Sequence, residues 1–248
     1  MSPTLTRAAF DNSDWLYELK WDGYRAITEV QGGAVRFYSR NLRPFDRRFN
    51  PVIESLKKIR HEAIFDGELV AVDERGIARF EWLQTYPRFG GQLAYYVFDL
   101  LYLDGYDLCG LPLESRKALL SKVLPNLPRV KLCEHIEGQG KAFFELSGKM
   151  GLEGIVAKHR KSLYRPGQRA NTWRKIKHRR RVELVIRGFT KHPTSILVGV
   201  ERDGELRFAG QVEFGFSRQE ITEFGPTLDR IGTERLPLRK ATPNGILA

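Results

Sequence analysis

The sequence predicts an α+β protein in which a mixed domain built on antiparallel sheet is followed by a small β-barrel domain. Two observations lead to this prediction. Through residues 1–178, short apolar runs alternate with Gly and Asp turns and a few helical stretches, as in antiparallel sheet covered by helices. After Arg181, several short strands follow one another within about 60 residues, which is typical of a small barrel. We therefore expect two domains, at residues 1–180 and 181–248.

The strands of the first domain begin with Trp15–Lys20, an alternating run that ends at the turn signal Asp22–Gly23. Arg25–Val30 and Ala34–Tyr38 follow, and the Gln31–Gly33 turn between them predicts a hairpin. Further strands are expected at Ala63–Val72, Leu93–Leu103, Val130–His135, Gly154–Lys158 and Thr172–Lys177.

Helices are predicted between these strands. Pro51 opens the first, because proline suits the first turn of a helix, and Val52, Leu56 and Ile59 then fall on one face. Two more are expected at Ser115–Leu124 and Lys141–Met150. For the second domain we expect strands at Val182–Thr190, Ile196–Glu201 and Leu206–Phe214, and a helix at Ser217–Ile231.

The composition excludes several classes of protein. The chain has 248 residues, of which 42% are hydrophobic and 29% charged, and no apolar run reaches the length of a membrane span. The N-terminal residues lack the basic end and apolar run of an export signal. Cys109 and Cys133 are isolated, without metal-type spacing, so we expect plain interior residues in a reducing cytoplasm.

The positive charge of the chain is concentrated in one segment. The net charge is +11, and residues 158–181 alone contain eleven Lys and Arg but no Asp or Glu. This density indicates contact with the phosphates of a polyanion, although a solvated tail also shows it. Tyr164, Trp173 and Ile176 lie inside the run and favour folded structure.

The segment from Glu18 to Arg25, Glu-Leu-Lys-Trp-Asp-Gly-Tyr-Arg, contains a candidate nucleophile. Lys20 stands at the end of an apolar strand beside a glycine turn, where partial burial and nearby positive charge lower the pKa of an amine and make it nucleophilic. Gly23 is expected to let the backbone approach a ligand, and Arg25 to hold a phosphate or a carboxylate. Taken alone, the Lys-x-Asp-Gly pattern is also compatible with a surface turn.

Acidic and aromatic residues farther along the chain are candidates for the same site. Glu68 follows Asp66–Gly67 in an apolar strand, and Glu153 stands at the start of another. Both carboxylates are also compatible with solvated positions. Phe98, within Tyr-Tyr-Val-Phe-Asp-Leu, suits base stacking or core packing nearly equally.

Three lysines complete the pattern. Lys158 stands at the opposite end of the short strand from Glu153, although it is also compatible with an ordinary surface charge. Lys175 and Lys177 flank Ile176 at strand spacing, so their ammonium groups are expected on the same face.

The order and spacing of these five elements resemble motifs I, III, IIIa, IV and V of the covalent nucleotidyltransferases, which include ATP-dependent DNA ligases, RNA ligases and mRNA capping enzymes. The segment Lys20–Arg25, the element Ser39–Asn41 and the stretch Phe208–Ser217 are most similar to bacterial ligase D-type DNA ligases. The resemblance extends from Trp15 to Ile231. It implies an adenylation domain followed by an OB-fold domain.

The resemblance implies a role for each matching residue. Lys20 would attack the α-phosphate of ATP, release pyrophosphate and carry a covalent AMP. The implied roles of the others are adenine recognition for Glu18, adenine stacking for Phe98, contact with the nucleotide and the nick phosphate for Arg25 and Arg40, ribose and metal binding for Glu68, metal binding for Glu153, and phosphate neutralisation for Lys158, Lys175 and Lys177. The metal is expected to be Mg²⁺ or Mn²⁺.

The implied activity is the sealing of nicks in double-stranded DNA, in the repair of double-strand breaks. AMP would pass from the lysine to the 5′-phosphate, and the 3′-hydroxyl would then expel it. A Ku-type end-binding protein is a candidate partner, and we expect a monomer in the bacterial cytoplasm, associated with the nucleoid. The alternatives are an RNA ligase or capping-type enzyme, and a ligase-derived module that binds nicks or ends without sealing them.

One motif of the family is not found. An Arg-x-Asp-Lys element is expected near the end of the barrel, where it orients the pyrophosphate of ATP, but no match precedes Ala248. We therefore expect an OB-fold without its final strands, and a first step less efficient than the sealing of already adenylylated nicks.

Overall fold

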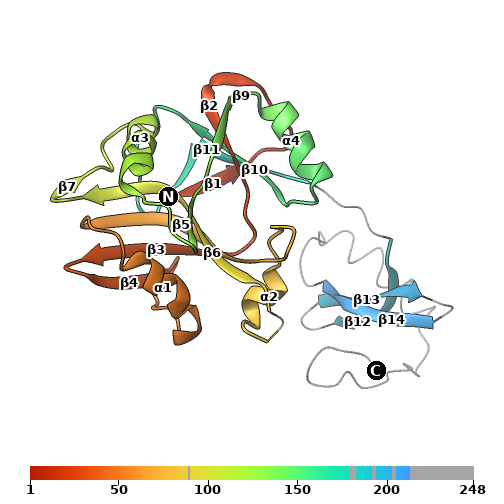
Figure 1. The fold of residues 1–248 in the computed structure, drawn as a ribbon. Helices are drawn as coiled ribbons and strands as arrows, with labels where there is room; N and C mark the ends of the chain where they lie inside the picture. The colour runs from red at the N-terminus through yellow and green to blue at the C-terminus, as the bar shows by residue number, and fades with distance from the viewer. Residues whose placement is uncertain (89, 179–182, 192–193, 203–204, 213–248) are drawn as a thin grey trace. The chain divides into compact units, whose positions relative to one another are not determined.

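The computed structural model describes residues 1–88, 90–178, 183–191, 194–202 and 205–212. The chain divides into two compact units, Met1–Arg179 and Arg180–Ala248, and each is treated separately below (Figure 1). Within the described residues, no helix is long and apolar enough to cross a membrane.

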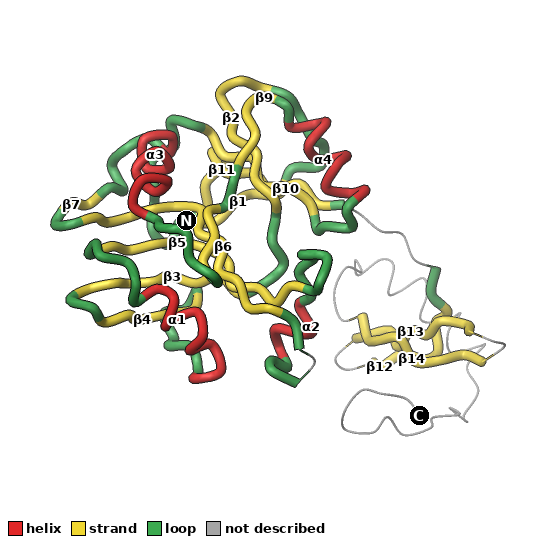
Figure 2. Tube along the Cα trace, viewed as in Figure 1, coloured by secondary structure: helices red, strands yellow, loops and turns green. Residues whose placement is uncertain are grey.

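The first unit contains two β-sheets, which are almost entirely antiparallel (Figure 2). The first sheet has the strand order β1-β11-β10-β2-β9 and the second β4-β3-β5-β6-β7, with β8 pairing to β6; only β1 with β11 and β8 with β6 run parallel. The first sheet comprises β1 (Ser2–Leu5), β2 (Asn12–Leu19), β9 (His135–Gly138), β10 (Gly154–His159) and β11 (Arg169–Lys177). The second comprises β3 (Tyr24–Gln31), β4 (Ala34–Ser39), β5 (Ala63–Val72), β6 (Gln92–Leu103), β7 (Tyr106–Asp107) and β8 (Val130–Leu132).

Helices cover the outer faces of these sheets (Figure 1). The second sheet packs against α1 (Asn50–Leu56), α2 (Phe80–Gln84) and α3 (Leu113–Val123), and a short 3₁₀ helix (Arg47–Phe49) precedes α1. The first sheet packs against α4 (Gly140–Lys149). One cluster of buried side chains joins the two sheets. In it, Leu16 and Trp173 of the first sheet pack near Leu101 of the second sheet. The two sheets therefore contact each other through apolar side chains.

A buried ion pair attaches α3 to the second sheet. Arg116 of α3 and Asp99 of β6 are both completely buried, and Nε and Nη2 of the arginine donate to the two carboxylate oxygens at 2.7 and 2.8 Å. The remaining guanidinium nitrogen donates to the carbonyls of Leu111 and Ser162. Because every charged atom has a partner, the pair holds the helix at a defined position on the sheet.

Most predicted elements are confirmed to within a few residues. The hairpin of β3 and β4 forms around the Gln31–Gly33 turn, and Val52, Leu56 and Ile59 all point into the core, although α1 ends at Leu56. The single strand expected at Val130–His135 is wrong. The chain breaks there into β8 and β9, which pair with β6 and β2 in different sheets. Periodicity cannot show such a change of sheet, because both halves remain extended.

The second unit contains three described strands, β12 (Val185–Lys191), β13 (Thr194–Arg202) and β14 (Glu205–Val212), which form an antiparallel meander. They lie where the strands of the second domain were predicted, with ends shifted by up to three residues. The helix expected at Ser217–Ile231 lies outside the described residues.

Candidate active site

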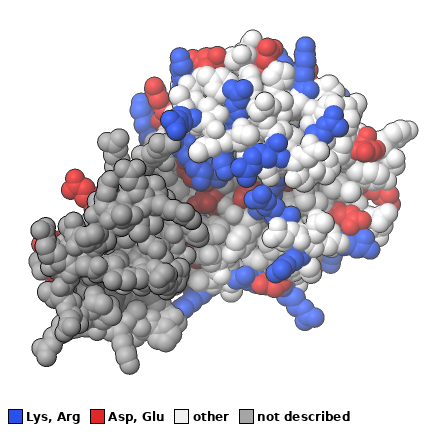
Figure 3. All heavy atoms as spheres, turned by 180° about the vertical axis from the view of Figure 1, so that it is seen from behind, with Lys and Arg blue, Asp and Glu red and all other residues white. Residues whose placement is uncertain are grey.

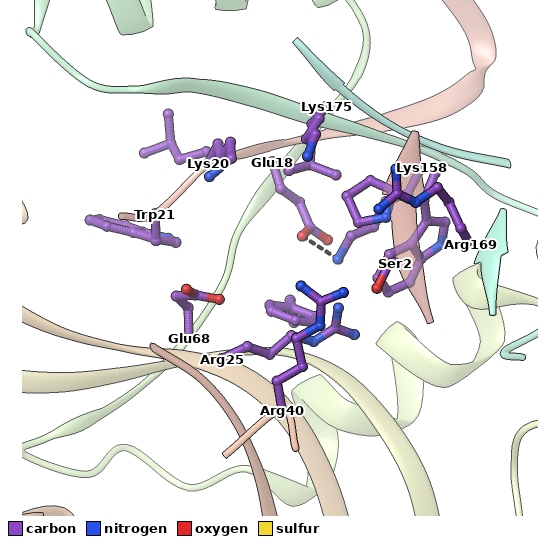
Figure 4. A pocket seen from close by; sticks show the side chains of 15 residues that line it. Ser2, Glu18, Lys20, Trp21, Arg25, Arg40, Glu68, Lys158, Arg169 and Lys175 are labelled. Carbon is purple, nitrogen blue, oxygen red and sulfur yellow. Dashed lines mark ion pairs between the residues drawn. The ribbon is translucent and has the colours of Figure 1, made fainter. Parts of the chain in front are cut away.

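A pocket of about 210 Å³ lies between the two sheets (Figure 4). The first sheet and the turn after it contribute Ser2, Pro3, Glu18, Leu19, Lys20, Trp21, Val156, Lys158, Arg169, Trp173 and Lys175. The second sheet and its turn contribute Arg25, Arg40, Glu68 and Phe98. The pocket therefore combines an aromatic and apolar wall with several cations and two carboxylates, as a nucleotide site requires.

Lys20 stands at the edge of this pocket. It follows β2 directly, and its backbone N–H donates to the carbonyl of Gly154 at 2.9 Å, which fixes the lysine beside β10. Its ammonium group forms an ion pair with Glu153, whose other oxygen lies 2.5 Å from the Nζ of Lys177. Glu153 thus joins Lys20, which follows β2, to Lys177 of β11. Although burial opposes the effect, hydrogen bonds from Lys177 and Lys20 lower the pKa of Glu153.

The glycine in the Lys20 loop has a packing role. A Cβ on Gly23 would lie 2.1 Å from the carbonyl oxygen of Leu69 and 2.8 Å from a methyl group of Val70. Gly23 therefore lets the loop approach β5. Gly23 also lines a second hollow beside the pocket, so close approach of its backbone to a ligand stays a prediction.

A buried charge cluster lies at the inner end of the pocket. Glu18 is 2% exposed, and its two carboxylate oxygens lie 2.7 Å from the Nζ of Lys117 and 2.6 Å from the Nζ of Lys158. Lys158 also lies over the rings of Phe98 and Trp173, with Nζ 4.0 and 4.2 Å from the centroids. Lys158 is thus a buried residue of the pocket wall, and the surface-charge alternative for it is wrong.

Burial acts on the ionisation of this cluster. It disfavours the Glu18 carboxylate, but the charges of Lys117 and Lys158 outweigh it and lower the pKa of Glu18. The two lysines respond in opposite directions. Burial lowers the pKa of Lys158, whereas the neighbouring Glu18 raises that of Lys117 despite its burial.

Arg25 is held by a carboxylate of the neighbouring strand. Its guanidinium pairs with Asp66, which is completely buried and also accepts a hydrogen bond from the hydroxyl of Tyr164 at 2.7 Å. Burial opposes the charge of Arg25, but Asp66 raises its pKa above the ordinary value. Of the two partners expected for Arg25, the structure shows the carboxylate. The same guanidinium lies 5.3 Å from the ring of Phe98 at the pocket wall.

Glu68 is a carboxylate without an ion pair among the described residues. It points into the pocket between Arg25 and Lys20 (Figure 4). Burial raises its pKa to about 8, an effect that Lys20 and Arg25 only partly oppose. A buried carboxylate that is costly to ionise is suited to a cation or a hydroxyl arriving with a ligand.

Cations surround the mouth of the pocket. Arg40, Arg169 and Lys175 line it from three different places, and none of them has an ion pair within the described part of the chain. Burial, followed by Lys177 and Lys20, lowers the pKa of Lys175. Figure 3 shows Lys and Arg side chains gathered on one face, with acidic groups between them. A second hollow of about 540 Å³ shares Arg25, Arg40 and Glu68 and continues toward the 3₁₀ helix.

Comparison with known proteins identifies the family. The model of the ATP dependent DNA ligase domain matches residues 3–177, which include every residue lining the pocket except Ser2. The chain belongs to the ATP-dependent DNA ligase family. It is 35% identical to the multifunctional non-homologous end joining DNA repair protein LigD of Mycobacterium tuberculosis over 247 residues, covering 96% of this chain and 32% of that protein. The LigD protein of Pseudomonas aeruginosa is 32% identical, with 93% of this chain and 29% of the relative covered.

A solved structure supports the same family. Mycobacterial DNA ligase D complexed with ATP and MES superposes with a TM-score of 0.66 at 33% identity, covering 98% of this chain and 82% of that one. The antiparallel-sheet fold predicted for the first domain, that of the covalent nucleotidyltransferases, is therefore confirmed. The chain spans about a third of the length of the LigD proteins it matches.

The ligase pocket brings together most of the residues singled out from the sequence. Eight of them line it: Glu18, Lys20, Arg25, Arg40, Glu68, Phe98, Lys158 and Lys175. Glu153 and Lys177 lie next to it through their contacts with Lys20. Trp21, Val156, Trp173 and Arg169 were not predicted as site residues, although each lies within the Lys20–Arg25 segment, a predicted strand or the basic run. Lys117 was also missed, because nothing in the pattern of α3 distinguishes it from a surface lysine.

Proposed function

We propose that this chain seals 5′-phosphate/3′-hydroxyl nicks in duplex DNA in an ATP-dependent reaction, and that Lys20 is its nucleophile. The observation that carries the proposal is the position of Lys20 at the edge of a pocket that holds an aromatic wall and unpaired cations. An adenylyl group transferred there would have its base against Phe98 and its phosphate near Lys20 and Lys175. Membership in the DNA ligase family favours this reaction over RNA ligation or capping.

In the first step, the Lys20 amine forms a bond to the α-phosphorus of ATP, and the bond to the β-phosphate oxygen breaks as pyrophosphate leaves. The ammonium group must first lose a proton. Glu153 contacts Lys20 and is the nearest acceptor among the described residues. Lys177 on the other oxygen of Glu153 and Lys175 at the pocket mouth supply positive charge for the developing phosphate charge.

The donor set of the pocket fits a divalent ion. Glu68 is a carboxylate that burial keeps protonated up to about pH 8, and a bound cation would favour its ionised form. The described residues contain no group of three or more His, Cys, Asp or Glu able to enclose a metal. Mg²⁺ commonly needs only one or two carboxylates, with substrate phosphates completing its shell. We propose Glu68 and Glu153 as these ligands; the ion would neutralise phosphate oxygens.

Glu153 can serve as a ligand only if its lysines turn away. In the structure its two oxygens are engaged by Lys20 and Lys177. Attack of Lys20 on the α-phosphate removes one of these contacts, because the amine becomes a neutral phosphoramide. Once Glu153 has passed the proton taken from Lys20 to solvent, its freed carboxylate oxygen would be available to hold the ion.

In the second and third steps, the 5′-phosphate of the nick takes the AMP and the adjacent 3′-hydroxyl then expels it. The unpaired Arg40 and Arg169 at the pocket mouth would bind the nick phosphates. We propose that β12–β14 belong to an OB-fold domain that contacts the duplex, since a short antiparallel meander is a component of such barrels. Residues 213–248, where the remaining barrel strands were predicted to be incomplete, lie outside the described residues.

The cellular setting is also a proposal. The LigD relatives are named for non-homologous end joining, so we propose a role in double-strand break repair in the bacterial cytoplasm. A Ku-type end-binding protein is the partner that this role would require. We propose that the chain acts on DNA as a monomer.

Incubation of the purified protein with α-labelled ATP and Mg²⁺ or Mn²⁺ tests the proposal. The expected result is acid-labile label on the protein, absent from Lys20→Ala and present in Lys131→Ala, which changes an exposed lysine. Nicks should also close. Closure only of an already adenylylated nick would point to a weak first step. Absence of label and of closure with either substrate would contradict the enzyme and favour a module that binds nicks. Faster sealing of RNA strands would favour the RNA ligase alternative.

A further inference from the structure

Lys117 is a buried lysine that lies outside the pocket. It belongs to α3 and is 5% exposed, and its Nζ donates to Glu18 at 2.7 Å and to the carbonyl of Cys133 at 3.0 Å. Buried lysines are rare unless they are paired, and the partner here is a carboxylate of the pocket wall. Lys117 does not itself line the pocket. Any effect on a ligand must therefore pass through Glu18.

Two lysine ammonium groups contact the single negative charge of Glu18, one more than is needed to neutralise it. Lys158 contacts its second oxygen at 2.6 Å. Figure 4 marks this ion pair with a dashed line. Burial lowers the pKa of Lys158, whereas Glu18 raises that of Lys117 against the effect of its burial. Lys117 therefore keeps its proton to higher pH than Lys158 does. Lys158 lines the pocket and lies over Phe98, so of the two lysines it is the one that would meet a bound base.

The two contacts also fix the orientation of the carboxylate. Each oxygen of Glu18 faces a different lysine, so the group cannot rotate without losing an ion pair. The Cys133 thiol, 3.8 Å from the second oxygen, adds a weak donor on the same side. An ionised carboxylate held in this way only accepts hydrogen bonds. The 6-amino group of adenine donates at the position where guanine carries an accepting oxygen.

We propose that Lys117 is a positioning residue that holds Glu18 ionised and oriented toward the 6-amino group of adenine, and thereby sets the preference for ATP over GTP. This inference rests on the proposed function. It assigns selectivity for the base to a side chain on α3 that never touches the nucleotide. A lysine that only attached α3 to β2 would affect stability and leave base selectivity unchanged.

The test compares Lys117→Met with Lys122→Met, an exposed lysine on the same helix. Covalent labelling of the full chain is measured with α-labelled ATP and with α-labelled GTP over a range of concentrations. For Lys117→Met, KM for ATP should rise about tenfold to a hundredfold with kcat little changed, the effect of losing a hydrogen bond to a charged group. The ATP-to-GTP ratio of kcat/KM should fall by a similar factor. Lys122→Met should match the wild type, and Lys117→Arg should recover part of the selectivity.

A folded Lys117→Met protein with wild-type selectivity would overturn the inference, whatever its Tm. If that variant does not fold, Glu18→Gln is compared with Glu18→Gln/Lys117→Met, in which no buried carboxylate is left unpaired. Loss of Lys117 should then cause no further loss of selectivity, and an additional drop would overturn the inference. A wild-type protein labelled by neither nucleotide contradicts the proposed function itself, which separates the two failures.

Discussion

Replacing Glu68 with glutamine removes a carboxylate that the fold disfavours. Burial raises the pKa of Glu68 from 4.5 to about 8, so the side chain is protonated in the folded protein at pH values where it ionises in the unfolded chain. A group whose folded pKa is raised contributes its stability below the unfolded pKa and loses it as pH rises through the folded pKa. Glu68 therefore costs the fold nothing below pH 4.5 and costs it most above pH 8. Glutamine does not titrate and escapes this cost.

The size of the effect follows from the same shift. A rise from 4.5 to about 8 corresponds to about 5 kcal/mol, at roughly 1.4 kcal/mol per pKa unit. The side chain is only half-buried, so water reduces this value, and we expect Glu68→Gln to gain about 1–2 kcal/mol at pH 9. The gain should vanish near pH 4. The Glu68→Gln variant should also lose covalent labelling with ATP. The reason is that the site gives up stability to hold a carboxylate that binds a ligand.

Urea unfolding followed by circular dichroism at pH 4, 7 and 9 measures the difference in the free energy of unfolding. Glu62→Gln, an exposed glutamate just before the same strand, is the matched control and should show no pH-dependent gain. Mg²⁺ should raise the Tm of the wild type at pH 7–8 more than that of Glu68→Gln. Equal stability of the wild type and Glu68→Gln at every pH would refute the reasoning.

Three further substitutions have defined outcomes. Gly23→Ala would place a methyl group 2.1 Å from the carbonyl of Leu69, so we expect a loss of about 2 kcal/mol or more by urea unfolding and much weaker labelling with ATP; normal labelling would contradict the packing role. Arg116→Met leaves Asp99 buried and unpaired and should lower the free energy of unfolding by about 3–5 kcal/mol; a loss below about 1 kcal/mol would show that water reaches the carboxylate. Arg40→Ala should weaken binding to nicked duplex and reduce its salt dependence in gel-shift titrations, and should also lower lysine labelling because Arg40 lines the nucleotide pocket; an unaltered salt dependence would exclude phosphate contact.

The elements predicted from local pattern agree with the structure because their periodicity reports which face is buried. The β3–β4 hairpin and α1 are examples, since a two-residue repeat and a three-to-four-residue repeat each specify one buried face. The Val130–His135 strand was wrong because extended backbone has the same pattern in either sheet. The small elements β1, β7 and α2 were not predicted, since they are too short to show a period.

The sequence by itself determined the family, the nucleophile candidate and the set of charged residues around it, because motif order and spacing are properties of the chain. Only the tertiary structure decided how those charges are partnered. Lys158, at the end of the strand predicted at Gly154–Lys158, is buried against Glu18. Arg25 is held by Asp66. Lys117 enters the site from a helix with no motif at all. The physical reason is that ionisation and partnership depend on burial and on contacts between residues distant in sequence, which no local pattern records.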